Sequence, residues 1–184
     1  MNSNIASLSE SELITLSSKG DSDAFGALYE KYVEKIYSYL YYKTSSQPQA
    51  EDLTSQVFLK ALRNIETYED RGYPFSAWLY RIAHNLVVNW YRDKDKIEQT
   101  PLEDGYPLPA KRDHVEEHLQ RSEEEEALLK VIGELSDDRQ QLVILKFVEG
   151  LTNQEIGEIM NRTEGAIKAL YHRTLSSLRD EYGV

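Results

Sequence analysis

The chain has 184 residues, enough for one medium-sized domain or two small ones, and 40% of them are hydrophobic, as in globular rather than disordered proteins. It has no cysteine, which excludes disulfides and cysteine-ligated zinc, and its net charge of −11 argues against strong independent affinity for nucleic acid. The sequence contains no run of about 18 apolar residues and no signal-peptide pattern near its start. We therefore expect a cytoplasmic protein without a membrane span.

The first half of the chain predicts four helices and no strands. Ser9 and Glu12 have the spacing of a capping box, and Asp21 is placed to cap the next helix. Pro48 falls in the first turn of a third helix, where its missing N–H is tolerated. Apolar residues at helical spacing predict that the second helix ends at about residue 43 and the third at about 65, and that the fourth covers about 76–94.

The second half predicts a linker and a shorter helical unit. Three prolines and a glycine interrupt residues 96–122, and the apolar periodicity disappears there. Further helices are expected over about 123–135 and 139–149, followed by a final pair of helices. The predicted fold is therefore all-α, with two small helical domains, 1–95 and 123–184, joined by an acidic flexible linker at 96–122.

The negative charge is concentrated away from the segments that could contact DNA. Residues 97–127 hold ten acidic residues against three basic ones, a balance of −7, and residues 1–30 add −4. In contrast, residues 81–96 have a balance of +2 and residues 161–179 a balance of +3. Because exposed charges are screened beyond about 10 Å at physiological salt, these two basic segments remain candidates for contact with DNA.

The segment LTNQEIGEIMNRTEGAIK, residues 151–168, has the pattern of a helix-turn-helix. Thr152 and Glu155 form a capping box, Asn161 suits a left-handed turn, and Thr163 can cap the second helix. Small, cationic and imidazole side chains share the outer face of that helix, which suits insertion into a major groove: Gly165, Lys168, Ala169, His172 and Arg173. An ordinary amphipathic helix pair with a solvated face is the alternative.

A second candidate is the aromatic and basic segment GYPFSAWLYRIAHNLVVNWYRDK, residues 72–94. Apolar residues including Trp78 can form a buried stripe, which leaves Phe75, Tyr80, Trp90 and Tyr91 as aromatics beyond the needs of a core. They are interleaved with cations and amides: Arg81, His84, Asn85, Asn89 and Arg92. Rings that stack on bases, cations that bind phosphates and amides that read base edges are typical of single-strand binding. An aromatic-rich core with a polar surface is the alternative.

Taken in order, four segments resemble a bacterial RNA polymerase sigma factor of the sigma-70 family, in its extracytoplasmic-function (ECF) group. They are DAFGALYEKY, QAEDLTSQVFLKAL, PFSAWLYRIAHNLVVNWYR and LSDDRQQLVILKFVEGLTNQEIGEIMNRTEGAIKALYHRTLSSLR. The resemblance covers about 21–95, which is similar to sigma region 2, and about 123–180, which is similar to region 4. It implies a protein that binds core RNA polymerase and directs promoter-specific transcription initiation.

The resemblance also implies roles for individual residues of the first domain. The third helix would dock on the polymerase β′ coiled coil through Asp52, Gln56, Phe58 and Leu59. The 71–75 break would capture a flipped base of the −10 element, and the next helix would read that element. The residues implied in single-strand contacts are Arg71, Tyr73, Phe75, Trp78, Arg81, Asn85, Asn89 and Arg92.

In the second domain, the resemblance places the outer helix of the helix-turn-helix in the major groove of the −35 element. The implied contacts are Thr163, Glu164, Gly165, Lys168, Ala169, His172 and Arg173. The implied partners are core RNA polymerase, through its β′ coiled coil and its β flap, and promoter DNA. An anti-sigma factor is a further candidate partner, and no membrane insertion is expected.

One short motif in the expected linker resembles a metal site instead. His114 to His118 fits H-x-x-E-H, an inverted zinc-protease pattern, but its flanks are charged and offer no apolar face to shield a metal. We therefore expect no metal and no cofactor. No Ser-His-Asp set or phosphate-binding glycine loop accompanies it, so an enzyme is not expected.

Two functional alternatives remain at the level of the sequence. The chain could be a helix-turn-helix transcriptional regulator, or a sigma-like decoy for an anti-sigma factor, in either case acting without polymerase. A simple regulator has no use for an exposed docking helix and single-strand aromatics, and a decoy could dispense with the basic −10 and −35 residues. The chain has both sets.

Overall fold

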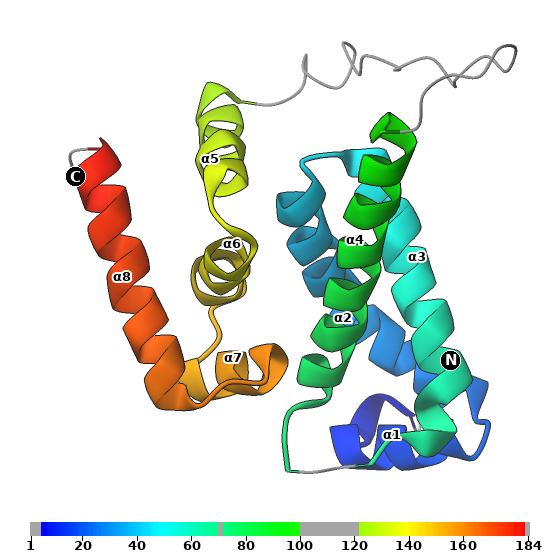
Figure 1. Cartoon of the computed structure of the whole chain (residues 1–184). Helices are drawn as coiled ribbons and strands as arrows, with labels where there is room; N and C mark the ends of the chain where they lie inside the picture. Colours follow the sequence, from blue (N-terminus) through cyan, green and yellow to red (C-terminus); the bar gives the residue numbers. More distant parts are fainter. Residues whose placement is uncertain (1–4, 70–71, 100–121, 183–184) are drawn as a thin grey trace, which may run out of the picture.

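The structure is a computed structural model that describes residues 5–69, 72–99 and 122–182, and its regular elements within these ranges are all helical (Figure 1). The prediction of an all-α fold is therefore confirmed. The proline-containing stretch of the expected linker and the His114–His118 motif lie outside the described residues. The helices are α1 (Glu10–Ser18), α2 (Ser22–Thr44), α3 (Gln47–Asn64), α4 (Phe75–Gln99), α5 (Glu123–Glu134), α6 (Asp137–Val143), α7 (Asn153–Met160) and α8 (Glu164–Tyr182).

Helices α1–α4, called here the first helical group, share one hydrophobic core. The long helix α2 packs against α1, α3 and α4, and its buried side chains recur at helical spacing, as in Leu28, Tyr32 and Ile36. Two short 3₁₀ turns, η1 (Ile5–Ser7) and η2 (Ile65–Thr67), complete this group. The side chains of α3 and α4 that fill the core from the other side are Leu53, Val57, Ala61, Leu79, Ala83 and Val87.

Local signals determine where several helices begin and end. Ser9 and Glu12 form the expected capping box, and the Asp21 carboxylate accepts a hydrogen bond from the Ala24 amide at 3.0 Å. Helix α3 begins at Gln47 with a proline in its first turn. Helix α4 runs five residues further than expected, to Gln99 rather than about Lys94.

The buried side chains of helices α5–α8, called here the second helical group, continue the hydrophobic core of the first group. Leu142, Ile156 and Ile167 are fully buried in it. The expected helix over 139–149 begins earlier, at Asp137, and widens into a π-helical turn, η4 (Ile144–Val148), which ends before Gly150 at a φ of +69°. The sequence did not predict this wide turn. Such turns are rare in helices and often occur at functional sites.

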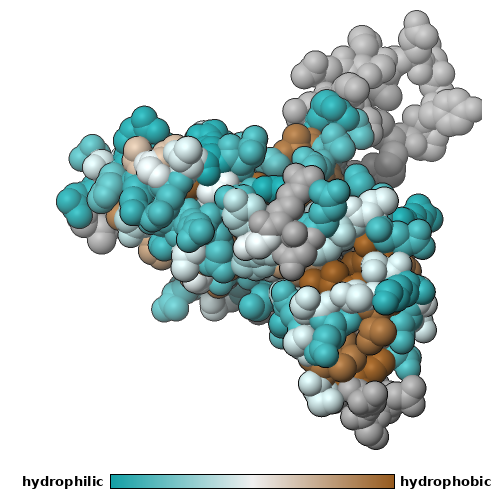
Figure 2. Space-filling model, turned by 90° about the horizontal axis from the view of Figure 1, so that it is seen from below, coloured by the Kyte–Doolittle hydropathy of each residue, from teal (hydrophilic) through white to brown (hydrophobic). Residues whose placement is uncertain are grey.

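The two groups pack against each other. Helix α7 contacts α4, while η4 and α5 contact α2. Figure 1 shows α7 directed toward α4, with α8 on the far side of the second group. Seen from below in Figure 2, the second group is mostly hydrophilic, whereas hydrophobic atoms gather on the first group. No helix in the described part of the chain has the length and apolar character needed to cross a membrane.

Candidate nucleic-acid interface

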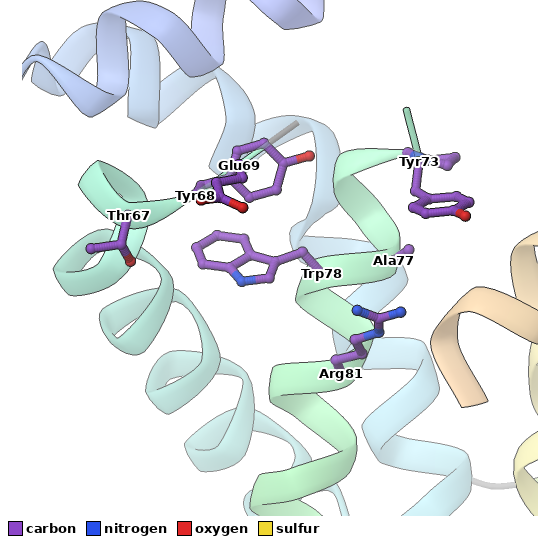
Figure 3. A pocket seen from close by; sticks show the side chains of 8 residues that line it. Thr67, Tyr68, Glu69, Tyr73, Ala77, Trp78 and Arg81 are labelled. Carbon is purple, nitrogen blue, oxygen red and sulfur yellow. The ribbon is translucent and has the colours of Figure 1, made fainter. Parts of the chain in front are cut away.

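A pocket of about 240 Å³ opens at the start of α4 (Figure 3). Tyr68 and Trp78 form one wall, with ring centroids 5.1 Å apart, and Trp78 points toward Tyr68 and Thr67. Tyr73 and Arg81 lie on the opposite side. The pocket therefore surrounds a space open to solvent with aromatic rings, a phenol and a guanidinium. Groups of these kinds bind unstacked bases in single-strand binding proteins. Its lining consists of Thr67, Tyr68, Glu69, Tyr73, Pro74, Ala77, Trp78 and Arg81.

Polar side chains continue from this pocket along α4. Arg81, Asn85, Asn89 and Arg92 recur at intervals of three or four residues and so share one face of the helix. Asn85, Asn89 and Arg92 are exposed, and Arg81 is half-buried. The structure thus brings Tyr73, Trp78 and Arg81 into one pocket and leaves the other three in a row beside it. Arg71 lies outside the described residues.

Two aromatic residues of this segment do not belong to the surface. Phe75 is 2% exposed and Tyr80 is 1% exposed, so the interpretation that both rings exceed the needs of the core is wrong. Phe75 lies beneath the pocket, with its ring centroid 5.3 Å from that of Tyr68 and 5.4 Å from that of Trp78. Its ring supports the aromatic wall from below and has no free face for a base.

The helix-turn-helix is built by local interactions around α7. The Thr152 hydroxyl accepts from the Glu155 amide at 3.2 Å, and the Glu155 carboxylate accepts from the Thr152 amide at 2.8 Å. Asn161 adopts the expected left-handed conformation, with φ 53° and ψ 48°. Gly157 has a role that no sequence pattern indicated: a Cβ there would lie 2.7 Å from the Arg162 carbonyl oxygen. Only glycine permits this close approach of the turn to α7.

Helix α8 presents the outer face that the sequence predicted. The Thr163 hydroxyl accepts from the Ala166 amide at 3.2 Å and caps the helix. Ile167, Leu170 and Thr174 are buried on the inner face. Lys168 forms an ion pair with Glu164 at 2.7 Å, which holds both side chains on the outer surface. All seven residues named for the major groove are exposed: Thr163, Glu164, Gly165, Lys168, Ala169, His172 and Arg173.

The outer face of α3 combines exposed polar and apolar side chains. Asp52 and Gln56 are exposed and joined by a hydrogen bond from Gln56 Nε2 to Asp52 Oδ2 at 2.7 Å. Leu59 is 48% exposed, next to an equally exposed leucine one turn further along the helix. Phe58 is only 5% exposed and packs edge-on against Tyr29, with centroids 4.8 Å apart. Its ring therefore belongs to the core, and only its neighbours Asp52, Gln56 and Leu59 are exposed on this face.

The second helical group has an exposed aromatic that the sequence analysis missed. Phe147 in η4 is 58% exposed, and its ring stacks on Tyr171 of α8 with centroids 6.1 Å apart. The helical period placed this residue inside an ordinary helix. Because η4 is π-helical, however, the side chains of this segment do not follow that period.

Contacts between the two groups form a further set that the sequence analysis did not identify. The Lys43 ammonium of α2 is fully buried and paired with Asp137 of α6. The Tyr80 hydroxyl donates to Glu149 Oε2 at 2.8 Å, and Arg81 Nε donates to the Glu158 carbonyl oxygen at 2.9 Å. Burial lowers the pKa of Lys43 and raises the pKa of Glu149. Both shifts show that these charged groups lose hydration in the packed arrangement.

The fold and these surfaces define a two-part helical protein with an aromatic pocket in one group and a helix-turn-helix in the other. Comparison with known proteins identifies the family. Residues 28–97 match the family model described as Sigma-70 region 2, and residues 125–178 match Sigma-70, region 4. The pocket and all but the last two residues of α4 fall in the first match, and α7 with α8 up to residue 178 falls in the second.

Relatives lead to the same conclusion. The chain is 31% identical to the ECF RNA polymerase sigma factor SigW of Bacillus subtilis, over 89% of this chain and 91% of that protein. It is also 31% identical to the RNA polymerase sigma factor YlaC of Bacillus subtilis, over 85% of this chain and 91% of that protein. Identity to the ECF RNA polymerase sigma factor BldN of Streptomyces coelicolor is 38% over 91% of this chain, which spans 63% of that relative's length.

The chain belongs to the sigma-70 family and, within it, to the ECF sigma factors, which direct transcription initiation with RNA polymerase. This family is not a family of enzymes, as the sequence predicted. Two solved structures share the fold at 20% identity. CnrH in complex with the cytosolic domain of CnrY has a TM-score of 0.69 over 92% of this chain and 96% of that one. RpoE of Bartonella quintana has a TM-score of 0.66 over 87% of this chain and 97% of that one.

Proposed function

We propose that this ECF sigma factor selects promoters through two surfaces, the pocket and outer face of α4 for the −10 element and the outer face of α8 for the −35 element. The observation that carries the proposal is the pocket beside Tyr68, Trp78 and Arg81, which joins stacking surfaces to a cation. Such a pocket is of little use to a protein that binds only duplex DNA. It suits a flipped base of a melted strand, with Tyr73 in the pocket, and Asn85, Asn89 and Arg92 extend the surface along that strand.

The −35 proposal is supported by the exposure and chemistry of α8. Lys168 and Arg173 are cations that can reach phosphates or guanine edges, while Gly165 and Ala169 allow close approach to the groove. The net charge of −11 opposes binding of the free chain to DNA. Promoter affinity therefore requires the additional contacts that polymerase supplies, and the isolated chain is expected to bind promoter DNA only weakly at physiological salt.

The proposed polymerase contacts lie on other surfaces than the proposed DNA contacts. We assign docking on the β′ coiled coil to the outer face of α3, where Asp52, Gln56 and Leu59 are exposed and Phe58 supports them from the core. Phe147 and Tyr171 offer an apolar surface on the second group for the β flap. Aromatic anchors of this kind often dominate the affinity of interfaces between proteins.

Two sets of substitutions separate the polymerase contacts of α3 from the −35 contacts of α8. Leu59→Ala is expected to weaken binding to core polymerase by about tenfold, whereas Leu128→Ala, at a leucine of similar exposure on α5, leaves it unchanged. Lys168→Ala combined with Arg173→Ala should reduce initiation at promoters with a −35 element and leave polymerase binding intact. Equal polymerase binding by the Leu59→Ala and Leu128→Ala variants would contradict the assignment of α3.

Two further points extend the proposal. RpoE of Bartonella quintana was solved in complex with the anti-sigma factor NepR. By analogy, an anti-sigma factor is the further partner proposed for this chain. The proposed place of action of this chain is the cytoplasm, where RNA polymerase and promoter DNA are found.

A further inference from the structure

The carboxylate of Glu10, in the first turn of α1, binds groups from two other helices. It accepts hydrogen bonds from the Lys31 ammonium and the Tyr32 hydroxyl of α2. It also accepts one from the backbone N–H of Phe75, the first residue of α4. Burial alone would raise the pKa of this carboxyl, but the three donors and the Lys31 charge outweigh it and lower the pKa of Glu10 below its ordinary value. The carboxylate is therefore ionised at neutral pH and ties α1 and α2 to the start of α4.

Helix α4 begins without an acidic residue of its own. Its first turn contains none, whereas the first turns of α1, α5, α7 and α8 each contain at least one. The first N–H groups of a helix have no partner within it, and a nearby carboxylate both accepts from them and is stabilised by the helix dipole. The Ala77 N–H bonds to the Pro74 carbonyl oxygen at 2.9 Å. The Phe75 N–H instead uses Glu10, which supplies from α1 the carboxylate that this turn lacks.

Phe75 connects this capping contact to the pocket. Its buried ring lies beneath the wall that Tyr68 and Trp78 form, and each of these rings contacts it. On its other side, the Phe75 ring is 5.8 Å by centroids from the ring of Tyr32, whose hydroxyl donates to Glu10. Helix α1 also contacts η2, directly before Tyr68, and Figure 1 shows α1 across the end of the first group at which α4 begins. The supports of the aromatic wall therefore converge on the Glu10 carboxylate.

We propose that Glu10 is a positioning residue for the pocket, which fixes the first turn of α4 and so keeps the aromatic wall in place to receive a base. Glu10 is not among the residues that line the pocket, so it acts through Phe75 and Tyr32. Helix α1 also lies outside residues 28–97, which match region 2. The use of the wall by a base rests on the proposed −10 function, whereas the fastening of the wall does not. A wall that is already ordered binds a base without the cost of ordering it.

The fluorescence of Trp78 reports on the wall in the free, full-length chain. The chain has two tryptophans, so Trp90→Phe provides a background in which only Trp78 emits. In this background, Glu10→Ala should raise the rate constant for quenching by acrylamide about twofold or more, because the start of α4 opens more often. Glu12→Ala is the matched control: it removes another carboxylate from the first turn of α1, one that binds Ser9, and should leave the quenching unchanged.

Two milder variants make the result decisive. Glu10→Gln keeps an oxygen that can accept from the Phe75 N–H, so it should show less than half of the increase in quenching that Glu10→Ala shows. Tyr32→Phe removes one donor to Glu10 but keeps the ring beside Phe75. It should raise the quenching by about 1.5-fold even if Glu10→Ala fails to fold, which circular dichroism would reveal. Quenching of Tyr32→Phe and of folded Glu10→Ala that matches the background would overturn the proposal. So would an equal increase in Glu12→Ala.

Transcription tests the consequence for DNA separately. With core RNA polymerase and pooled genomic fragments, Glu10→Ala should give about fivefold or fewer of the transcripts that Glu12→Ala gives, although both variants bind polymerase equally. Glu10→Gln should restore most of the yield. A loosened wall with an undiminished yield would overturn the positioning role. The proposed −10 function fails independently if Trp78→Ala supports transcription as well as the parent chain does, whatever the quenching of the Glu10 variants shows.

Discussion

Gly157 provides a direct test of the helix-turn-helix geometry. A Cβ at this buried position would lie 2.7 Å from the Arg162 carbonyl oxygen and 3.7 Å from the Glu164 amide nitrogen. The first distance is too short for carbon and oxygen, and the obstacle is backbone that also forms the Arg162 N–H to Gly157 O bond at 2.8 Å. Overpacking of this kind costs about 1–3 kcal/mol, only partly offset by the roughly 1 kcal/mol helix preference of alanine.

Gly157→Ala should therefore cost up to about 2 kcal/mol net, which lowers the melting temperature of the second helical group by up to about 8–16 °C, since each kcal/mol corresponds to about 4–8 °C in a domain of this size. Thermal unfolding followed by circular dichroism measures the shift. Gly133→Ala is the matched control, because Gly133 lies in α5 with open space around its Cβ position and should gain about 0.5–1 kcal/mol. A Gly157→Ala chain that melts at or above the parent temperature would refute the close approach of the turn to α7.

Three further predictions concern the core, a cap and the contact between the groups. Phe58→Ala should lower the free energy of unfolding, measured in urea, by about 3–5 kcal/mol because it empties a core position. Leu59→Ala should lower it by about 0.5 kcal/mol or less because Leu59 is exposed, and equal losses would contradict the assignment of the two side chains. Thr152→Ala should destabilise the second group by about 1 kcal/mol through loss of the capping box, measured by the same unfolding and compared with Thr15→Ala in the exposed middle of α1. Burial raises the pKa of Glu149 above its ordinary 4.5, against the opposing effects of the Tyr80 and Ser38 hydroxyls and the Lys35 ammonium. The contribution of this group to the free energy of unfolding should thus be fully present below pH 4.5 and be lost as the pH rises through the raised pKa, a trend in urea unfolding that Glu149→Gln should remove.

The features that the sequence predicted correctly are those determined by neighbouring residues. The caps at Ser9, Asp21 and Thr152 and the left-handed turn at Asn161 depend on side chains within four positions of the backbone they satisfy. The inner face of α8 follows from the helical period, and Ile167 is indeed fully buried. The sequence therefore sufficed to predict the helix-turn-helix and its exposed outer face.

The sequence predictions failed where contacts between distant helices determine whether a side chain is buried or paired. Phe75 and Tyr80 carry the same local signal as an exposed stacking ring, yet α2 and the second helical group cover them. Lys43 and Asp137 are 94 positions apart, and no local pattern pairs a lysine near the end of one helix with an aspartate at the start of another. The clash at Gly157 likewise depends on the path of the turn, which the glycine alone does not reveal.

Transcription in a reconstituted system tests the central claim most directly. Core RNA polymerase, the full-length chain and pooled genomic fragments are combined, and the 5′ ends of the transcripts are mapped. The account predicts defined start sites that require the chain and share sequences at −10 and −35, with initiation reduced by Lys168→Ala plus Arg173→Ala. The absence of any transcript that depends on the chain, or start sites that do not share these elements, would contradict it.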